Sequence, residues 1–158
     1  MADDILLKDL IDSELVFVNS TASSLEEVIN NVASKMIDKD IVKDSYPEAV
    51  ISREKELPTG LNIGSEFGIA IPHTDVQHVN RSAIGITTLE KPIKVHSMVN
   101  PEDIIDTQLV FNLSVADPDG QIKILQQLMG LFKNIDVLKE ILASKDAGQI
   151  IDVVNKNI

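Results

Sequence analysis

The sequence predicts an α/β fold: a single domain over residues 1–158, with a mixed, mainly parallel sheet of about four to five strands and helices on both faces. Short runs of β-forming residues alternate with longer stretches whose apolar residues recur at helical spacing. The strongest strand, residues 107–115, is an almost continuous apolar run, which is typical of the middle of a sheet. A chain of 158 residues has the size of one domain, and it shows neither an internal repeat nor an interdomain linker.

The predicted strands share a content of β-branched residues and are bounded by residues that favour turns. In chain order they are residues 14–18, an irregular turn or edge strand at 58–64, and residues 69–71, 82–89, 93–96 and 107–115. Lys91 and Pro92 are expected to form a turn between the two strands that flank them.

The predicted helices share apolar residues at helical spacing. They follow a helical or loose lead-in over residues 1–12 and cover residues 25–38, 47–57, 121–132, 134–143 and 146–155. A doubled capping box at residues 23–27 begins the first helix, and Pro58 ends the second. Residues 117–120 are predicted to form a turn, after which Gln121 opens the third helix. The buried face of that helix is expected to contain Ile122, Leu125, Met129 and Phe132, widened by Ile124, Leu128 and Leu131.

Composition and charge exclude several classes of function. Apolar residues make up 44% of the chain and charged residues 25%, as in globular proteins. The net charge of −11 repels nucleic-acid phosphate and anionic membranes but attracts a basic partner, so we expect no nucleic-acid partner. The absence of cysteine excludes disulfides and a cysteine nucleophile. The sequence shows no signal peptide and no apolar run of membrane-spanning length, so we expect a cytoplasmic protein.

The segment Gly68-Ile69-Ala70-Ile71-Pro72-His73-Thr74-Asp75 carries the strongest functional signal. Its apolar residues predict a short buried strand, and Pro72 ends that strand because proline donates no backbone hydrogen bond. His73 therefore follows a rigid strand end, where a loop can present a side chain to solvent. An imidazole exchanges protons and acts as a nucleophile near neutral pH, although a lone histidine in a loop is often only structural.

Other chemistries receive less support from the sequence. It contains no G-x-S-x-G elbow of a hydrolase, no P-loop and no G-x-G-x-x-G dinucleotide fingerprint. A metal site could use His73, Asp75 and His78, but histidines five residues apart in a loop lack the spacing of a zinc-binding helix. His96, on a predicted strand, is expected to be structural or exposed. We therefore expect neither a metal nor a cofactor.

Phosphoryl transfer through His73 remains open. A phosphoryl-accepting histidine needs one free ring nitrogen, a fixed hydrogen-bond acceptor for the other nitrogen, and donors for the phosphoryl oxygens. Arg53 is the candidate cation, although a mixed-charge string such as residues 52–56 also fits a solvated helix face. The candidate neutral donors are Thr59, Thr74, His78 and Gln121.

Three motifs occur in one order along the chain: Arg53-Glu54-Lys55, Pro58-Thr59-Gly60-Leu61 and Gly68-Ile69-Ala70-Ile71-Pro72-His73. Together they resemble the enzyme IIA domain of the mannitol/fructose class (type 2) of the bacterial sugar phosphotransferase system, and the resemblance covers nearly the whole chain. Within that class, Pro-Thr-Gly-Leu, Ile-Pro-His-Thr-Asp with a further histidine at His78, and Lys-Val-His96 look most like the stand-alone galactitol-type proteins.

This resemblance implies a phosphohistidine carrier. Such a domain accepts a phosphoryl group from the phosphocarrier HPr and passes it to a cysteine of a IIB protein. The IIB protein then phosphorylates the sugar or sugar alcohol that enters through the membrane component IIC, so contact with IIC is only indirect. The match places the phosphohistidine at His73 and the phosphate-facing arginine at Arg53. The alternative is a regulatory relative of the nitrogen-control type, which shares the core motif and binds partners according to its phosphorylation state.

The sequence departs from mannitol-type members at two places. Those members usually carry a small residue after the active histidine, where this chain has Thr74. They also carry a second active-site histidine near the start of the helix that follows the strongest strand, where this chain has Gln121. We expect Gln121 or His78 to take over that supporting role. An apolar docking patch for the donor and the acceptor is expected to include Phe67, Ile71 and the loop over residues 74–79.

Overall fold

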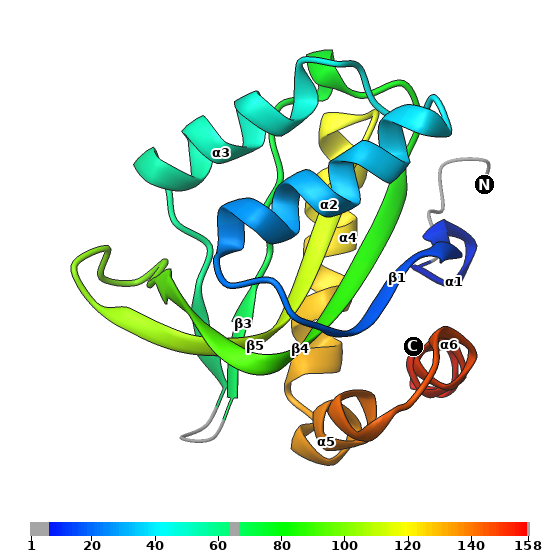
Figure 1. Cartoon of the computed structure of the whole chain (residues 1–158). Coiled ribbons are helices and arrows are strands. Elements are labelled where there is room, and N and C mark those ends of the chain that lie inside the picture. Colours follow the sequence, from blue (N-terminus) through cyan, green and yellow to red (C-terminus); the bar gives the residue numbers. More distant parts are fainter. Residues whose placement is uncertain (1–6, 64–66, 158) are drawn as a thin grey trace.

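A five-stranded mixed sheet lies between two groups of helices (Figure 1) in the structure, a computed structural model that describes residues 7–63 and 67–157. The strands are β1 (Ile11–Ser20), β2 (Leu61–Ile63), β3 (Phe67–Ala70), β4 (Ala83–His96) and β5 (Ile104–Ser114). The helices are α1 (Leu7–Leu10), α2 (Leu25–Asp38), α3 (Tyr46–Glu56), α4 (Pro118–Phe132), α5 (Ile135–Ala143) and α6 (Ala147–Lys156), with a short 3₁₀ turn η1 at Val76–His78. The predicted α/β fold class is confirmed.

The strand order β1-β4-β5-β3-β2 places β5 in the middle of the sheet, as its apolar run predicted. The pairs β1–β4 and β3–β5 are parallel, whereas β4–β5 and β2–β3 are antiparallel. β2 lies at the edge of the sheet and confirms the edge strand predicted within residues 58–64.

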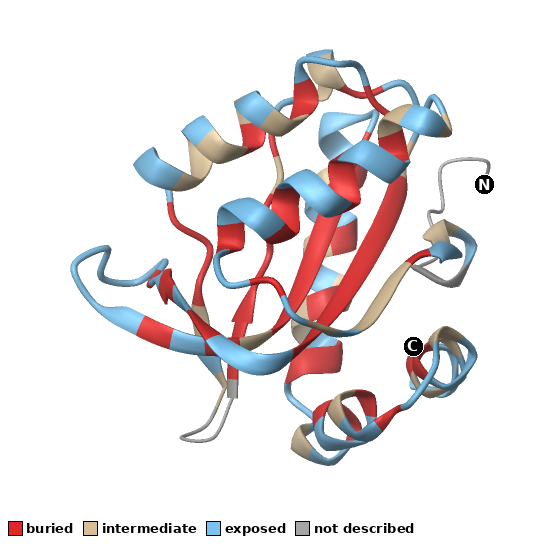
Figure 2. Cartoon of the chain, in the orientation of Figure 1, coloured by how far each residue is buried: buried red, intermediate tan, exposed pale blue. Residues whose placement is uncertain are grey.

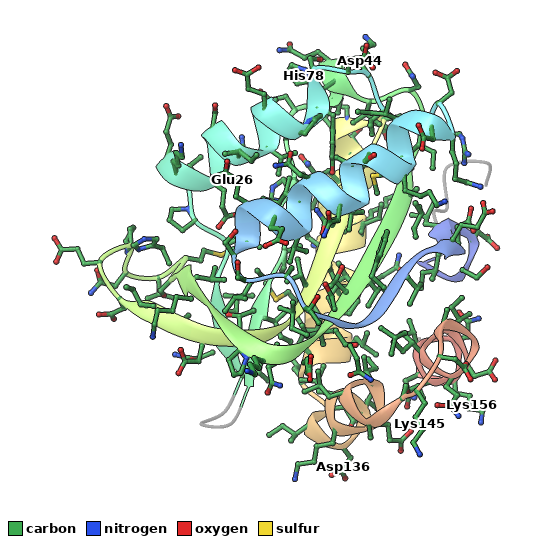
Figure 3. All side chains as sticks on the ribbon, viewed as in Figure 1. Glu26, Asp44, His78, Asp136, Lys145 and Lys156 are labelled. Carbon is green, nitrogen blue, oxygen red and sulfur yellow. The ribbon has the colours of Figure 1, made fainter. Side chains whose placement is uncertain are left out.

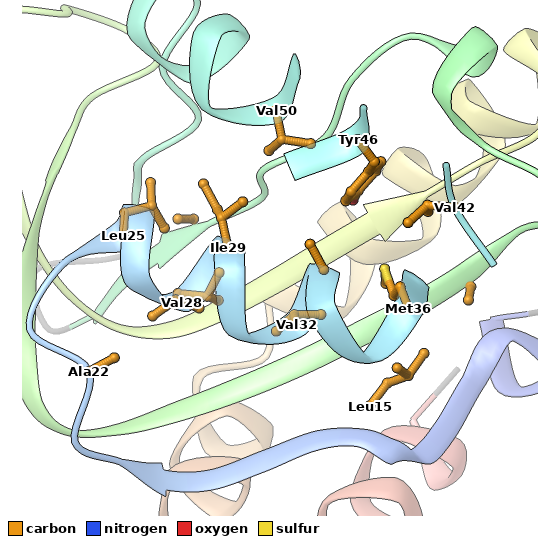
Figure 4. Packing of buried hydrophobic residues seen from close by; sticks show 14 of the residues in the cluster. Leu15, Ala22, Leu25, Val28, Ile29, Val32, Met36, Val42, Tyr46 and Val50 are labelled. Atoms are coloured by element: carbon orange, nitrogen blue, oxygen red, sulfur yellow. The ribbon is translucent and has the colours of Figure 1, made fainter. Parts of the chain in front are cut away.

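Two apolar layers enclose the sheet, in which residues 83–89 of β4 and residues 109–114 of β5 are buried (Figure 2). One layer packs α2 and α3 against one face of the sheet and includes Val28, Val32, Tyr46 and Val50 (Figure 4). The other packs α4, α5 and α6 against the opposite face and includes Phe111, Ile124, Leu128, Leu138 and Ile150. Each buried side chain of this size stabilises the fold by about 1.5–3 kcal/mol, so the strand ends are held firmly from both sides.

The N-terminal part largely follows the prediction. Of the predicted lead-in over residues 1–12, residues 1–6 lie outside the described ranges, and the rest form α1 and the start of β1. α2 begins with the predicted cap, since the Ser24 hydroxyl accepts a hydrogen bond from the Glu27 amide at 3.1 Å. The Glu27 carboxylate in turn accepts one from the Ser23 amide at 2.9 Å.

The turn predicted at Lys91 and Pro92 is wrong, because β4 continues through both residues. The antiparallel pairing with β5 is irregular between Thr88 and Ile93 and resumes where Ile93 faces Thr107. Proline cannot donate to a strand ladder, but a strand tolerates it at a bulge. The irregular stretch therefore accommodates Pro92 within one long strand.

The turn predicted at residues 117–120 is also wrong, because α4 begins at Pro118. Asp117 caps this helix, and its carboxylate accepts a hydrogen bond from the Gly120 amide at 3.0 Å. Proline suits the first helical position, where an amide hydrogen would have no partner within the helix. Gln121 consequently lies in the first turn of α4.

The buried face of α4 differs from the predicted one at Ile122, which is 59% exposed. The core-facing residues are Ile124, Leu128, Leu131 and Phe132. Ile124 and Leu128 are four residues apart and share one face of the helix. Ile122 precedes Ile124 by two residues, which corresponds to a rotation of about 200° around the helix axis and points its side chain to solvent.

Replacement of Gly68 tests the close approach of β3 to β5. A Cβ atom on Gly68 would collide with the backbone carbonyl oxygen of Asp106 in β5, so Gly68→Ala is expected to destabilise the fold by about 1–3 kcal/mol or more. Gly130→Ala is the control, because a Cβ atom there meets open space in α4 and should stabilise by about 0.5–1 kcal/mol. Urea unfolding followed by circular dichroism gives both values. Equal effects of the two substitutions would contradict this strand packing.

Candidate functional site

His73 lies just beyond the end of β3, on a segment that is fastened to the sheet. Ile71 and Pro72 are buried, whereas His73 is partly exposed. The carbonyl oxygen of Pro72 accepts a hydrogen bond from the Leu113 amide of β5 at 3.0 Å. The position of His73 is therefore set by β3 and by the bond to β5, and His73 follows a strand end, as the sequence predicted.

The imidazole of His73 is held in one tautomer. Its Nδ1 lies 2.7 Å from the carbonyl oxygen of Ile71. A carbonyl oxygen only accepts hydrogen bonds, so Nδ1 carries the proton and donates it. In the neutral ring the lone pair is then on Nε2, which is the nitrogen available to attack an electrophile.

Burial keeps this ring neutral. It lowers the pKa of His73 below the ordinary value of 6.5, although the hydrogen bond to Ile71 acts in the opposite direction. The positive charge of Arg53 also lowers this pKa, and the negative charge of Asp75 raises it. Nε2 is therefore unprotonated near neutral pH, as nucleophilic catalysis by histidine requires.

A hydrogen-bond relay through Thr59 holds the backbone amide of Ile71. The Thr59 hydroxyl accepts a hydrogen bond from the Ile71 amide at 3.0 Å and donates one to Glu54 Oε1 at 2.8 Å. The other carboxylate oxygen of Glu54 accepts a hydrogen bond from the Thr59 amide at 2.8 Å. Thr59 is 4% exposed, so its hydroxyl acts inside the protein. The relay connects α3 to Ile71, the residue whose carbonyl oxygen orients His73.

Glu54 is a site residue that the sequence reasoning missed. Burial raises its pKa above the ordinary value of 4.5, and the two hydrogen bonds from Thr59 oppose this change. The sequence placed Glu54 in a mixed-charge helix face. Its contact with Thr59 crosses the turn at Pro58, and no helical spacing reveals such a contact.

Arg53 immediately precedes Glu54 on α3 and reaches the loop that follows His73. Its Nη1 lies 3.5 Å from Asp75 Oδ1, and its side chain is 34% exposed. Its Nε is buried without a hydrogen-bond partner in the described part of the chain. Arg53 is thus a half-buried cation near His73, and it retains capacity to donate further hydrogen bonds.

Gln121 and Thr74 meet on the other side of the loop. Gln121 Nε2 donates a hydrogen bond to the Thr74 carbonyl oxygen at 3.4 Å, which brings the first turn of α4 next to His73. Thr74 is 5% exposed. Of the predicted site residues, Arg53, Thr59, Thr74 and Gln121 are therefore linked to His73 or to its neighbours in the chain.

The two remaining histidines have other neighbours. His78, labelled in Figure 3, has its Nδ1 2.8 Å from the Ser45 hydroxyl, and this contact joins η1 to the start of α3. Its Nε2 lies 3.3 Å from the side-chain amide nitrogen of Gln77. His96 is exposed, and its Nδ1 lies 2.8 Å from the carbonyl oxygen of Pro101. The expectation that His96 is exposed is confirmed.

The predicted docking patch is wrong at Ile71, which is 0% exposed and belongs to the core, and at both ends of its loop, since Thr74 and Val79 are buried as well. The side chain of Phe67 lies outside the described parts of the structure. Two large apolar residues that face solvent do lie next to site residues: Ile122 beside Gln121 on α4, and Leu57, whose amide donates to the Arg53 carbonyl oxygen.

Neither a metal-binding cluster nor a membrane-spanning helix occurs in residues 7–63 and 67–157. These residues contain no group of three or more histidines and acidic residues that could hold a metal ion. None of the helices in the same ranges has the length and apolar character needed to cross a membrane.

Residues 9–157 match the family model described as "Phosphoenolpyruvate-dependent sugar phosphotransferase system, EIIA 2". The chain belongs to this family. The "PTS system galactitol-specific EIIA component" of Escherichia coli strain K12 is 33% identical over 130 residues, which cover 80% of this chain and 85% of that relative. EIIA components are phosphocarriers, so the predicted family and the predicted phosphotransferase class are both confirmed.

Solved structures of IIA domains share the fold. A putative PTS IIA domain from Streptococcus pyogenes M1 GAS superposes with a TM-score of 0.79 at 20% identity and covers 98% of both chains. The Escherichia coli mannitol IIA, solved in complex with phosphorylated mannitol IIB, gives a TM-score of 0.77 at 18% identity and covers 93% of this chain and 99% of that chain. At such identities the likeness establishes the fold.

Thr59→Val tests the relay behind His73. The substitution nearly preserves the shape of the side chain but leaves the Ile71 amide and Glu54 Oε1 without their partner, which is expected to cost about 1–3 kcal/mol of unfolding free energy. Thr59→Ser keeps the hydroxyl and serves as the control, with a smaller loss. Urea unfolding measures both variants. If serine is as destabilising as valine, the hydroxyl does not support the site.

Proposed function

We propose that His73 is the phosphoryl carrier, which accepts the group from HPr and passes it to a cysteine of a cognate IIB protein. The observation that carries this proposal is the hydrogen bond from His73 Nδ1 to the Ile71 carbonyl oxygen, which leaves Nε2 of the same ring free. Membership in the EIIA 2 family supplies the class of reaction.

In the transfer step, the Nε2 lone pair of His73 attacks the phosphorus atom of the phosphohistidine on HPr. The new Nε2–P bond forms as the N–P bond of HPr breaks, and that electron pair stays on the HPr imidazole. The His73 ring then carries Nδ1–H and Nε2–P and gains positive charge, which the carbonyl oxygen of Ile71 stabilises by accepting a stronger hydrogen bond. A thiolate of IIB later attacks the same phosphorus atom, and the Nε2–P electron pair returns to His73.

The neighbouring side chains divide the remaining tasks. Arg53 stabilises the phosphoryl oxygens through donors that its contact with Asp75 does not use. The amide group of Gln121 supports the phosphoryl group in place of the second histidine of mannitol-type members. Thr59 acts through the Ile71 peptide, while Thr74 and His78 fix the two ends of the loop that follows His73.

The similarity to a relative named for galactitol supports a substrate of the sugar or sugar-alcohol class for the complete transport system. We infer that residues 1–158 act as a single IIA domain in the cytoplasm. In that arrangement the domain exchanges the phosphoryl group with HPr and IIB and contacts the membrane component IIC only indirectly.

Incubation with phosphoenolpyruvate, enzyme I and HPr tests this function. The wild type is expected to gain one acid-labile phosphoryl group by intact mass spectrometry, and His73→Ala is expected to gain none. His78→Ala, the control, should still accept the group. Arg53→Ala should slow acceptance of the phosphoryl group by about 10²–10³-fold. Arg53→Lys keeps the positive charge but should recover only part of the rate, because lysine lacks the planar fork. Phosphorylation of His73→Ala at the wild-type rate would refute the proposal.

A further inference from the structure

Arg53 already has an anionic neighbour in the unphosphorylated protein. The carboxylate of Asp75 lies 3.5 Å from Arg53 Nη1, and this ion pair joins α3 to the loop that carries His73. Asp75 follows His73 by only two residues. The cation that would hold a phosphoryl group is therefore paired with a carboxylate next to the phosphoryl acceptor.

This pairing is incomplete. A strong charge-assisted hydrogen bond has a donor–acceptor distance of about 2.7–2.9 Å, whereas the Arg53–Asp75 contact is a single one at 3.5 Å. The Nε of Arg53 is buried without a partner in the described residues. The Asp75 side chain is 71% exposed and keeps much of its hydration. A phosphoryl dianion on His73 would therefore compete well for the guanidinium group.

Asp75 also remains close to the site after such an exchange. The preceding residue, Thr74, is buried, and its carbonyl oxygen accepts the hydrogen bond from Gln121. The charges of Arg53 and Asp75 act on the His73 ring with opposite sign, so both side chains are near enough to influence a group bound there. A carboxylate near enough to act on the His73 ring also repels a phosphoryl dianion bound to that ring.

We propose that Asp75 is a positioning residue that occupies Arg53 while His73 is unphosphorylated and weakens the hold of the site on the phosphoryl group. The inference rests on the proposed role of His73 as the carrier. Such weakening has a direct use, because a carrier that bound the phosphoryl group too firmly would pass it on poorly.

The equilibrium of phosphoryl exchange with HPr tests this role. Wild-type protein and variants are mixed with phosphorylated HPr, brought to equilibrium and analysed by intact mass spectrometry for the phosphorylated fraction of each partner. Asp75→Asn is expected to shift the exchange constant about 2–5-fold towards this protein, the scale of an exposed charge pair. Damage to the structure would instead reduce phosphorylation of this protein. An increase in its phosphorylated fraction is therefore specific to the proposed role of Asp75.

Asp106→Asn is a matched control. Asp106 forms an ion pair with Lys94 at the same distance, 3.5 Å, and its side chain is 70% exposed. The substitution changes the net charge of −11 by the same amount and should leave the exchange constant unchanged. Asp75→Glu keeps the negative charge and should also stay near the wild-type value.

Arg53→Gln separates action through Arg53 from direct repulsion. In that background the shift caused by Asp75→Asn should become smaller, because no guanidinium group remains for the carboxylate to occupy. An undiminished shift would overturn the positioning role, as would an Asp75→Asn constant equal to that of the wild type. Absence of any phosphorylation of the wild type would instead overturn the function proposed for His73.

Discussion

The hydrogen bond from His73 Nδ1 to the carbonyl oxygen of Ile71 is the interaction on which the site depends. It determines which ring nitrogen is free, and its geometry depends on the core because the acceptor belongs to a core residue. Ile71 is fully buried, and its own amide donates to the Thr59 hydroxyl. The next carbonyl oxygen, that of Pro72, is bonded to β5. The packing of the sheet thus controls the chemistry of a partly exposed side chain.

Helix α3 contributes two adjacent residues of opposite charge to the site, Arg53 and Glu54. Glu54 points to Thr59 and supports the peptide beneath His73, whereas Arg53 reaches the loop beyond it. The carboxylate of Glu54 holds Thr59 in place, whereas the role proposed for the guanidinium group of Arg53 is charge stabilisation. Because both are on α3, the packing of that helix through Tyr46 and Val50 sets both contacts together.

Sequence patterns predicted much of this arrangement, since its main determinants are local. Glycine and proline bound the strand before His73, an almost continuous apolar run identified β5, and apolar residues at helical spacing identified α2. The patterns failed where a tertiary contact decides the outcome, as at Pro92, which the irregular β4–β5 pairing accommodates.

The site itself was predictable only in part. His73 and Arg53 belong to recognisable motifs, and the structure joins Arg53 to the loop after His73. The contact between Glu54 and Thr59 depends on the path of the chain through Pro58, which spacing does not reveal. Ile122 is exposed because the core-facing side of α4 is set by Ile124 and Leu128, from which Ile122 is rotated to the solvent side of the helix.

The most direct measurement of the central claim is the protonation of the His73 ring, followed by long-range ¹H–¹⁵N NMR of histidine-labelled protein across a pH titration. The ring is expected to be neutral at neutral pH, with the proton on Nδ1, and to gain its second proton only below the ordinary pKa of 6.5. A proton on Nε2 in the neutral ring, or a pKa at or above 6.5, would contradict the account.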